Sequence, residues 1–394
     1  MSVIGEGTYN KVYLSNKNAV KDLLYEELAS GSKIISTNSL REIAFLSYLN
    51  NPYVVQPISI DDKHLHMRYG GVNLLTYYKS HSISPNELKD IFKQTLLGLE
   101  YIHKMGIIHC DIKPQNILYN KGRINICDFN ISSLNTGITH GKVYTSWYRP
   151  LESLYGYYNQ KSDIWALGCT MWELYSKIPL FANLKTDNSN QEVVNRILNK
   201  LGIPEDDIIA KYGLQNNINE YFKHFAHHTN QPIDSSDKEF NDLIRLMLSY
   251  DVDKRPTATD ALTHPYFTQP YDLNLQTVKI VDAKPNGTKP KQCDIDENFQ
   301  VIDLYLRLKK ISNTTMKLSK NLLYYLIESH GFTSDALYQW IVLCIISSLS
   351  DGEVLDFYTD CIEELNAEVS EIDFGVAVQD ILHICNFNII NPNA

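Results

Sequence analysis

The residues best suited to chemistry lie in two short polar segments near the middle of the chain. The first, "IIHCDIKPQNIL", contains Asp111, Lys113 and Asn116, and the second, "INICDFN", contains Asp128. Both are flanked by strand-like residues, and the turn sequence "NKG" separates them. A carboxylate can accept a proton from an attacking hydroxyl, a lysine can neutralise a transferred phosphate, and Asp and Asn oxygens suit Mg²⁺. The joint order and spacing indicate phosphoryl transfer, whereas each segment alone is also typical of a capped loop.

A further phosphate-binding feature opens the chain as "IGEGTYNKVYLSNKNAVKDLL". Its alternating apolar residues predict two strands joined by a tight turn at "SNKN". Gly5 and Gly7 let the backbone approach a phosphate closely, and Lys21 follows on the second strand. Asn10 stands where the third glycine of a GxGxxG pattern would be. This pattern is weak by itself, and a plain β-hairpin is the alternative interpretation.

The stretch 36–49, which begins "STNSLREIAFL", predicts an amphipathic helix with Arg41 and Glu42 near its first turns. Leu40 and Ile43 make its outer face more apolar than a solvated surface helix requires. We therefore expect another part of the chain to pack against this helix.

The 394-residue length predicts more than one domain, and the net charge of −10 argues against a nucleic-acid-binding function. No segment is typical of a signal peptide, and the longest apolar run, 340–346, is too short to cross a membrane. Seven dispersed cysteines without metal-ligand spacing indicate free thiols in a reducing compartment. We expect an intracellular protein, in the cytoplasm or the nucleus, that binds neither membranes nor nucleic acid.

The order and spacing of the motifs from Ser2 to Phe267 resemble those of the cyclin-dependent kinases. The resemblance covers about two-thirds of the chain and rests on these stretches: "GEGTYNKVY", "STNSLREI", "HCDIKPQNIL", "YTSWYRPLE", "SDIWALGC", "ILNKLGIP" and "DKRPTATDALTHPYF". It implies an α+β bilobal protein kinase fold over 1–269, with an N-lobe (1–70) and a C-lobe (71–269). It also implies ATP and Mg²⁺ as cofactors and proteins as substrates.

The resemblance assigns roles to individual residues. The catalytic group that it implies is Asp111 as base, Lys113, Lys21, Glu42 and Thr145. The implied ATP-binding residues are Ile4, Gly5, Glu6, Gly7, Val12, Ala19, Lys21, Met67, Arg68, Tyr69, Gly70, Asn116, Leu118 and Asp128, of which Asn116 and Asp128 would also bind the metal. Met67 falls at the gatekeeper position, and Glu152 and Arg255 would form a buried ion pair.

Substrate preference is implied in the same way. Lys113, two residues after Asp111, favours serine or threonine over tyrosine as the phosphate acceptor. Arg149 resembles the arginine that supports a pocket for a proline after the target residue, although Tyr144 replaces a smaller residue there. We therefore expect proline-directed Ser/Thr specificity.

Several positions depart from the family pattern. Asn10 and Asn130 replace glycines, and asparagine tolerates a positive φ better than most residues, so both changes are compatible with the required backbone. Cys110 and Ser133 replace two arginines of the phosphate-binding cluster, and only Arg41 remains.

The site that would be phosphorylated aligns with His140, beside Thr139. We therefore expect activity without activation-loop phosphorylation, because ordering a loop by phosphate needs several guanidinium partners. Thr8 and Tyr9 match the family's inhibitory phosphosites and are otherwise ordinary loop residues.

The remainder of the chain divides into a predicted linker (270–297) and five helical stretches (298–394) around one nearly all-apolar helix. This plan and the ending "ILHICNFNIINPN" resemble a cyclin box, with an unspecified helical adaptor as the alternative. Leu349 and Val378 fall where cyclins commonly carry a lysine and a glutamate that grip the kinase.

The resemblance implies an all-α five-helix cyclin-like domain that activates the kinase in cis through the helix at 36–49. A linker of about 25 residues reaches roughly 80 Å and supplies an effective concentration of about millimolar. Two alternatives stay open: a catalytically inactive kinase and cyclin scaffold, and a constitutive kinase with a helical docking domain.

Overall fold

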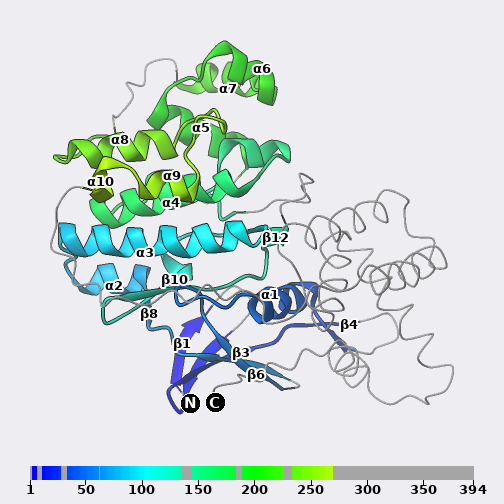
Figure 1. Ribbon diagram of the computed structural model, residues 1–394. Helices are drawn as coiled ribbons and strands as arrows, with labels where there is room; N and C mark the ends of the chain where they lie inside the picture. The colour runs from blue at the N-terminus through cyan, green and yellow to red at the C-terminus, as the bar shows by residue number, and fades with distance from the viewer. Residues whose placement is uncertain are drawn as a thin grey trace, which may run out of the picture.

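A sheet-rich part and a larger helical part make up the region that the computed structural model describes (Figure 1). The described residues are 2–6, 11–27, 33–61, 63–134, 144–182, 189–225 and 233–268. The expected linker and the expected cyclin-like helices, with Leu349 and Val378, therefore lie outside the described residues. So do Gly7, Thr8, Tyr9, Asn10, Thr139 and His140.

The sheet-rich part is a five-stranded antiparallel sheet. Its order across the sheet is β1 (Ser2–Glu6), β2 (Lys11–Ser15), β3 (Asn18–Asp22), β7 (His64–Arg68) and β6 (Pro57–Ile60). The turn between β2 and β3 has φ of 49° at Asn16 and 68° at Lys17, the positive values that a two-residue type I′ hairpin turn requires. The predicted hairpin at "SNKN" is therefore confirmed, and it fixes the register that carries Lys21.

A small ribbon and one helix complete the sheet-rich part. The ribbon pairs β4 (Tyr25–Glu27) with β5 (Lys33–Ile35), and helix α1 (Thr37–Tyr48) follows at once. The side chain of Ser36 caps α1 by accepting a hydrogen bond from the backbone N–H of Ser39. The predicted helix is confirmed, and Ile43 of its apolar edge is buried.

The helical part is built around α3 (Pro85–Lys104) and α4 (Gln160–Ser176), which lie one above the other in Figure 1. A small sheet joins β8 (Val72–Asn73), β10 (Ile117–Asn120) and β11 (Arg123–Ile126), and β9 (Ile107–Ile108) pairs with β12 (Ser133–Leu134). The other described elements are α2 (Leu74–Ser80), η1 (Pro114–Asn116), η2 (Leu151–Tyr155), α5 (Asn190–Leu201), α6 (Asp206–Tyr212), α7 (Gln215–Phe225), α8 (Lys238–Met247), α9 (Ala258–Leu262) and α10 (Pro265–Thr268).

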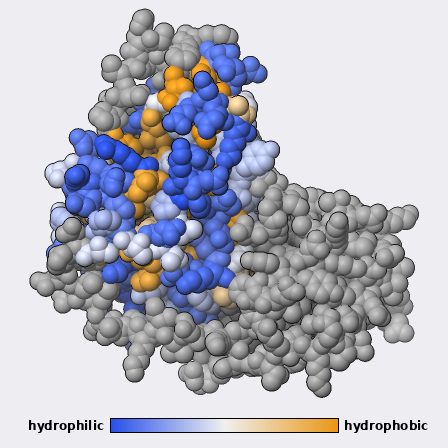
Figure 2. All heavy atoms as spheres, turned by 45° about the horizontal axis from the view of Figure 1, so that its top comes forward, coloured by the Kyte–Doolittle hydropathy of each residue, from blue (hydrophilic) through white to orange (hydrophobic). Residues whose placement is uncertain are grey.

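The helical part is held together by a buried apolar core. Trp165 on α4 is fully buried and stacks on Phe181, and the inner faces of α3 and α8 are buried as well. Figure 2 shows that polar residues cover much of the coloured surface, with hydrophobic residues in separate patches. None of the described helices is long and apolar enough to span a bilayer.

Candidate active site

Lys21 is the meeting point of three segments that are distant in sequence. Its Nζ lies 2.7 Å from Glu42 Oε2 and 2.8 Å from Asp128 Oδ1, so β3, α1 and the segment after β11 converge on one ammonium group. Lys21 and Glu42 are buried. Although burial lowers it, the carboxylates of Asp128 and Glu42 raise the pKa of Lys21 above its ordinary value. The lysine is therefore a permanent cation placed for an anionic ligand.

Asp111 is held by three neighbouring side chains. Lys113 Nζ lies 2.6 Å from Asp111 Oδ2, and the Nδ2 of Asn116 donates to the same oxygen at 2.9 Å. The hydroxyl of Thr145 donates to Asp111 Oδ1 at 2.8 Å and accepts from Lys113 at 2.9 Å. Four residues that the sequence analysis singled out are thus brought together with a fixed carboxylate at the centre.

Asp163 holds the backbone of the loop just before Asp111. The sequence analysis assigned this residue no role. It is fully buried on α4 and accepts hydrogen bonds from the backbone N–H groups of His109 and Cys110 at 2.8 and 2.9 Å. His103 Nε2 lies 2.9 Å from the same carboxylate. A lone aspartate among the apolar residues of "SDIWALGC" was the available signal, because a buried carboxylate needs partners.

His109 ties the two polar segments together. Its Nδ1 accepts from the backbone N–H of Asp111, and its Nε2 lies 3.1 Å from the carbonyl oxygen of Cys127, so the ring carries its proton on Nε2. Burial lowers the pKa of His109, which keeps the ring neutral and able to accept. The buried ring of Phe129 packs against the imidazole at a centroid distance of 4.8 Å.

Two further contacts hold the segment that begins at Tyr144, where the described residues resume. Arg255 and Glu152 form a buried bidentate ion pair, with N–O distances of 2.6 and 2.7 Å. Arg149 donates through Nε and Nη2 to the carbonyl oxygen of Tyr144, at 3.1 and 2.8 Å. That carbonyl belongs to a residue with φ of 69° and is therefore already paired within the chain.

The residues expected to bind ATP lie on several strands and on the segment after β7. Ile4, Gly5 and Glu6 belong to β1, Val12 to β2, Ala19 to β3, and Met67 and Arg68 to the end of β7, followed by Tyr69 and Gly70. Ala19 and Met67 are directly paired and buried. Gly70 packs so closely on Leu118 that a Cβ would come within 2.7 Å of its Cδ1. The strands that carry these residues are neighbours in the sheet, and Gly70 joins them to Leu118 of β10, whereas Gly7 is outside the described residues.

The backbone at Asn130 is not left-handed, so it is one that an asparagine adopts without strain. The positive φ lies at Asp128, at 71°, and Asn130 is not among the described residues with positive φ. Aspartate also tolerates this conformation. Asn130 instead offers its carbonyl oxygen to Arg41 Nη1 at 3.4 Å. The asparagine therefore meets no left-handed requirement here.

Cys110 and Ser133 form a neutral contact where a cationic cluster would be needed. Their Sγ and Oγ atoms lie 3.8 Å apart, and Cys110 is fully buried with φ of 65°. Burial raises the pKa of the Cys110 thiol well above its ordinary value, so the group is uncharged. Neither side chain can neutralise a phosphate.

The sheet with its paired lysine, the helix α1 and the two polar loops define a phosphotransferase of the protein kinase type. A family model described as protein kinase domain matches residues 1–267, and the chain belongs to this family. It is a serine/threonine protein kinase.

Curated relatives come from two kinase groups. The chain is 28% identical over 317 residues to mitogen-activated protein kinase 14 of Xenopus laevis, a match that covers 75% of this chain and 86% of the relative. It is 30% identical over 316 residues to cyclin-dependent kinase 12 of Caenorhabditis elegans, covering 70% of this chain and 41% of the relative. It is 29% identical over 287 residues to mitogen-activated protein kinase HOG1 of Cryphonectria parasitica, a match that covers 68% of this chain and 78% of the relative.

Proposed function

We propose that this kinase transfers the γ-phosphoryl group of ATP to serine or threonine hydroxyls of proteins, with Asp111 as the general base. The observation that carries this proposal is the clamp of Thr145, Lys113 and Asn116 on the Asp111 carboxylate. The substrate hydroxyl gives its proton to Asp111 while its oxygen bonds to the γ-phosphorus, and ADP leaves with the electrons of the broken P–O bond. Lys113 neutralises charge on the transferred group.

The residues present fit ATP and Mg²⁺, which protein kinases generally use. Asp128 supplies a carboxylate, and Asn116 supplies an amide oxygen because its Nδ2 is committed to Asp111. Lys21, held by Glu42, is positioned for the phosphates. Bound Mg²⁺ would neutralise phosphate charge, and the protein's part is to hold the donors in place.

We propose proline-directed specificity on the pairing of Arg149 with the Tyr144 carbonyl. A substrate residue after the target normally needs an acceptor for its backbone N–H, and here that acceptor is occupied. Proline has no backbone N–H, so it leaves no hydrogen-bond donor without a partner.

Kinetics with paired Ser-Pro and Ser-Ala peptides test this specificity. We expect a clear preference for Ser-Pro in the wild type and a smaller preference in R149A. Equal kcat/KM for both peptides would contradict it.

We propose that activity does not require a phosphorylated activation loop. The neutral Cys110–Ser133 contact supports this, because a phosphate there would meet only Arg41 among the three cluster positions. The test is the activity of full-length protein that mass spectrometry shows to be unphosphorylated, beside its T139A variant. Both should be fully active; a requirement for phosphate on Thr139 would refute the proposal.

We further propose that the C-terminal region at 298–394 acts as a tethered, cyclin-like activator through α1. This rests on the sequence resemblance and on the inward placement of α1, whose Glu42 reaches Lys21. We also propose that the protein acts inside the cell, in the cytoplasm or the nucleus. The alternatives are an inactive scaffold and a constitutive kinase whose C-terminal region docks substrates.

A protease site inserted into the predicted linker separates these alternatives in the intact protein. After cleavage, the C-terminal region should stay bound at high protein concentration and keep the kinase active. On dilution it should dissociate and the activity should fall, because the tether no longer supplies a high effective concentration. The uncleaved protein is the dilution control. Activity on a short peptide that survives both cleavage and dilution would favour the docking interpretation, and inactivity throughout would favour the scaffold.

A further inference from the structure

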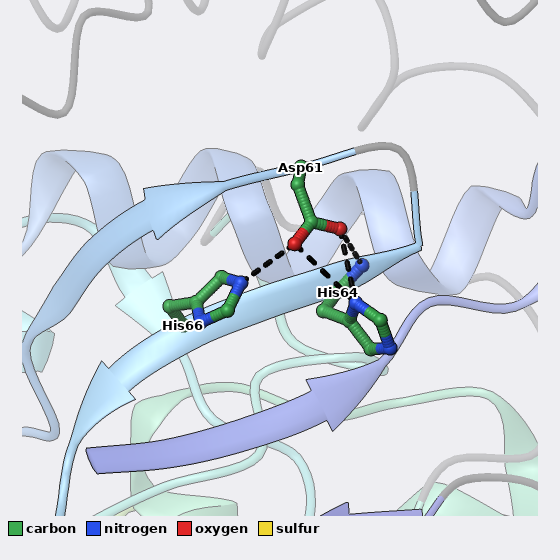
Figure 3. Close-up of side chains that lie close together, drawn as sticks. All are labelled: Asp61, His64 and His66. Atoms are coloured by element: carbon green, nitrogen blue, oxygen red, sulfur yellow. Dashed lines mark hydrogen bonds and ion pairs between the residues drawn. The ribbon is translucent and has the colours of Figure 1, made fainter. Parts of the chain in front are cut away.

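A carboxylate and two imidazoles gather on the hairpin of β6 and β7, away from the catalytic loops (Figure 3). His64 and His66 alternate with the buried Leu65 and Met67, so both rings stand on the opposite face of β7. Asp61 follows β6 in the connecting turn and faces both rings. The candidate ligand atoms of the three side chains all lie within 4.8 Å of one another.

The backbone aims the carboxylate of Asp61. The N–H groups of Lys63 and His64 both donate to its Oδ1, each at 2.9 Å. Its Oδ2 lies 2.7 Å from His66 Nε2, and His64 Nδ1 lies 3.0 Å from Oδ1 and 3.3 Å from Oδ2. The turn thus holds Oδ1, and both carboxylate oxygens face imidazole nitrogens.

We propose that Asp61, His64 and His66 bind one divalent transition-metal ion, with Zn²⁺ as the best-matched ion. Two imidazoles and a carboxylate are ligands that Zn²⁺ accepts, at bond lengths of about 2.0–2.2 Å. Tetrahedral ligands at such lengths are roughly 3.3 Å apart, which matches the 3.3 Å from Oδ2 to His64 Nδ1, whereas the 2.7 Å from Oδ2 to His66 Nε2 would have to lengthen. The side chains are 28–51% exposed, so an ion can enter and water can complete the coordination.

Asp22 supplies an outer partner of the kind that metal-bound histidines use. Its Oδ1 lies 3.7 Å from Nε2 of His64, the nitrogen that carries the proton when Nδ1 binds a metal. Asp22 stands opposite His64 in the β3–β7 pairing, and its Oδ2 accepts from the Tyr13 hydroxyl at 3.2 Å. Bound metal would therefore join β6, β7 and β3, the strand that also carries Lys21, and should raise the thermal stability of the protein.

The experiment is a Co²⁺ titration of metal-free, full-length protein followed by visible absorption, then displacement by Zn²⁺. The chain has 12 histidines and 7 cysteines, so the number of bound equivalents is compared between variants. The double variant H64Q/H66Q and the variant D61N should each lose one equivalent. D22N should keep it with about 10- to 100-fold weaker affinity, as expected for an outer-shell carboxylate. H81A, which removes an exposed imidazole elsewhere, should behave as the wild type.

The result that overturns the proposal is the same number of equivalents, with the same affinity, in wild type and in H64Q/H66Q. Loss of an equivalent in H81A as well would also overturn it, since binding would then be unspecific. The unfolding temperature of each metal-free variant serves as the folding control. Zn²⁺ should raise the unfolding temperature of the wild type and of H81A, and leave those of D61N and H64Q/H66Q unchanged.

Discussion

The hydroxyl of Tyr144 donates a hydrogen bond to Asp163 Oδ1 at 3.1 Å, with both residues buried. The same oxygen accepts from the backbone N–H of Cys110, next to Asp111. The segment at Tyr144, which we propose to position the substrate, is therefore joined to the loop of Asp111 through one carboxylate. The link holds the two segments together through hydrogen bonds to Asp163, whereas the uncharged side chain of Cys110 cannot bind a phosphate.

Removing this hydroxyl should slow catalysis. In Y144F we expect kcat/KM to fall about fivefold, corresponding to about 1 kcal/mol, because one buried hydrogen bond is lost while Asp163 keeps its backbone donors. Steady-state kinetics with a Ser-Pro peptide measure this. Y250F is the matched control, since it removes a hydroxyl that donates to the Gly202 carbonyl. Equal effects of the two variants on kcat/KM would argue against a specific role.

The base assignment makes a larger prediction. D111N should lower kcat by about 10²- to 10⁴-fold, because the amide cannot accept the substrate proton. Binding of ATP, measured by calorimetry, should change little, since Lys21, which we propose to bind the phosphates, is intact. D253N, which alters an exposed carboxylate, is the control. Retention of most of the activity in D111N would remove Asp111 from the role of base.

The buried pair of Glu152 and Arg255 should dominate the stability of its neighbourhood. R255M leaves the Glu152 carboxylate buried without its ion partner and should lower the free energy of unfolding by about 3–5 kcal/mol. The exposed adjacent Lys254 makes two long contacts, with Glu205 at 3.9 Å and with Asp251 at 4.0 Å, so K254A should cost less than about 1 kcal/mol. Urea unfolding followed by fluorescence compares them; similar costs would contradict this account.

Two glycines with positive φ give a matched test of close packing at the segment after β7. Gly71 has φ of 110°, and a Cβ there would collide with the carbonyl oxygen of Tyr119. Gly122 has φ of 85° with nothing within 4 Å of a Cβ. G122A should cost about 1 kcal/mol from backbone strain alone, whereas G71A should add about 1–3 kcal/mol of overpacking. Thermal unfolding measures both; an equal cost would mean that the segment yields easily.

Local patterns in the sequence predicted the elements that carry the candidate site. The SNKN turn, the capped helix at 36–49 and the polar loops around Asp111 and Asp128 each follow from short-range spacing and are present in the structure. The order and spacing of the residue types also indicated phosphoryl transfer, because few sets of side chains can bind Mg²⁺, neutralise phosphate and accept a proton. These properties belong to single residues and to their nearest neighbours along the chain.

Only the tertiary structure decided which atoms meet. Lys21 reaches Asp128 across 107 positions, and Asp163 collects donors from the catalytic loop and from Tyr144. The left-handed backbone falls at Asp128 and not at Asn130, and the histidines of β7 find Asp61 through strand alternation and a turn. The physical reason is that contacts between distant segments depend on how whole elements pack, and packing energy is shared among many residues that no short pattern contains.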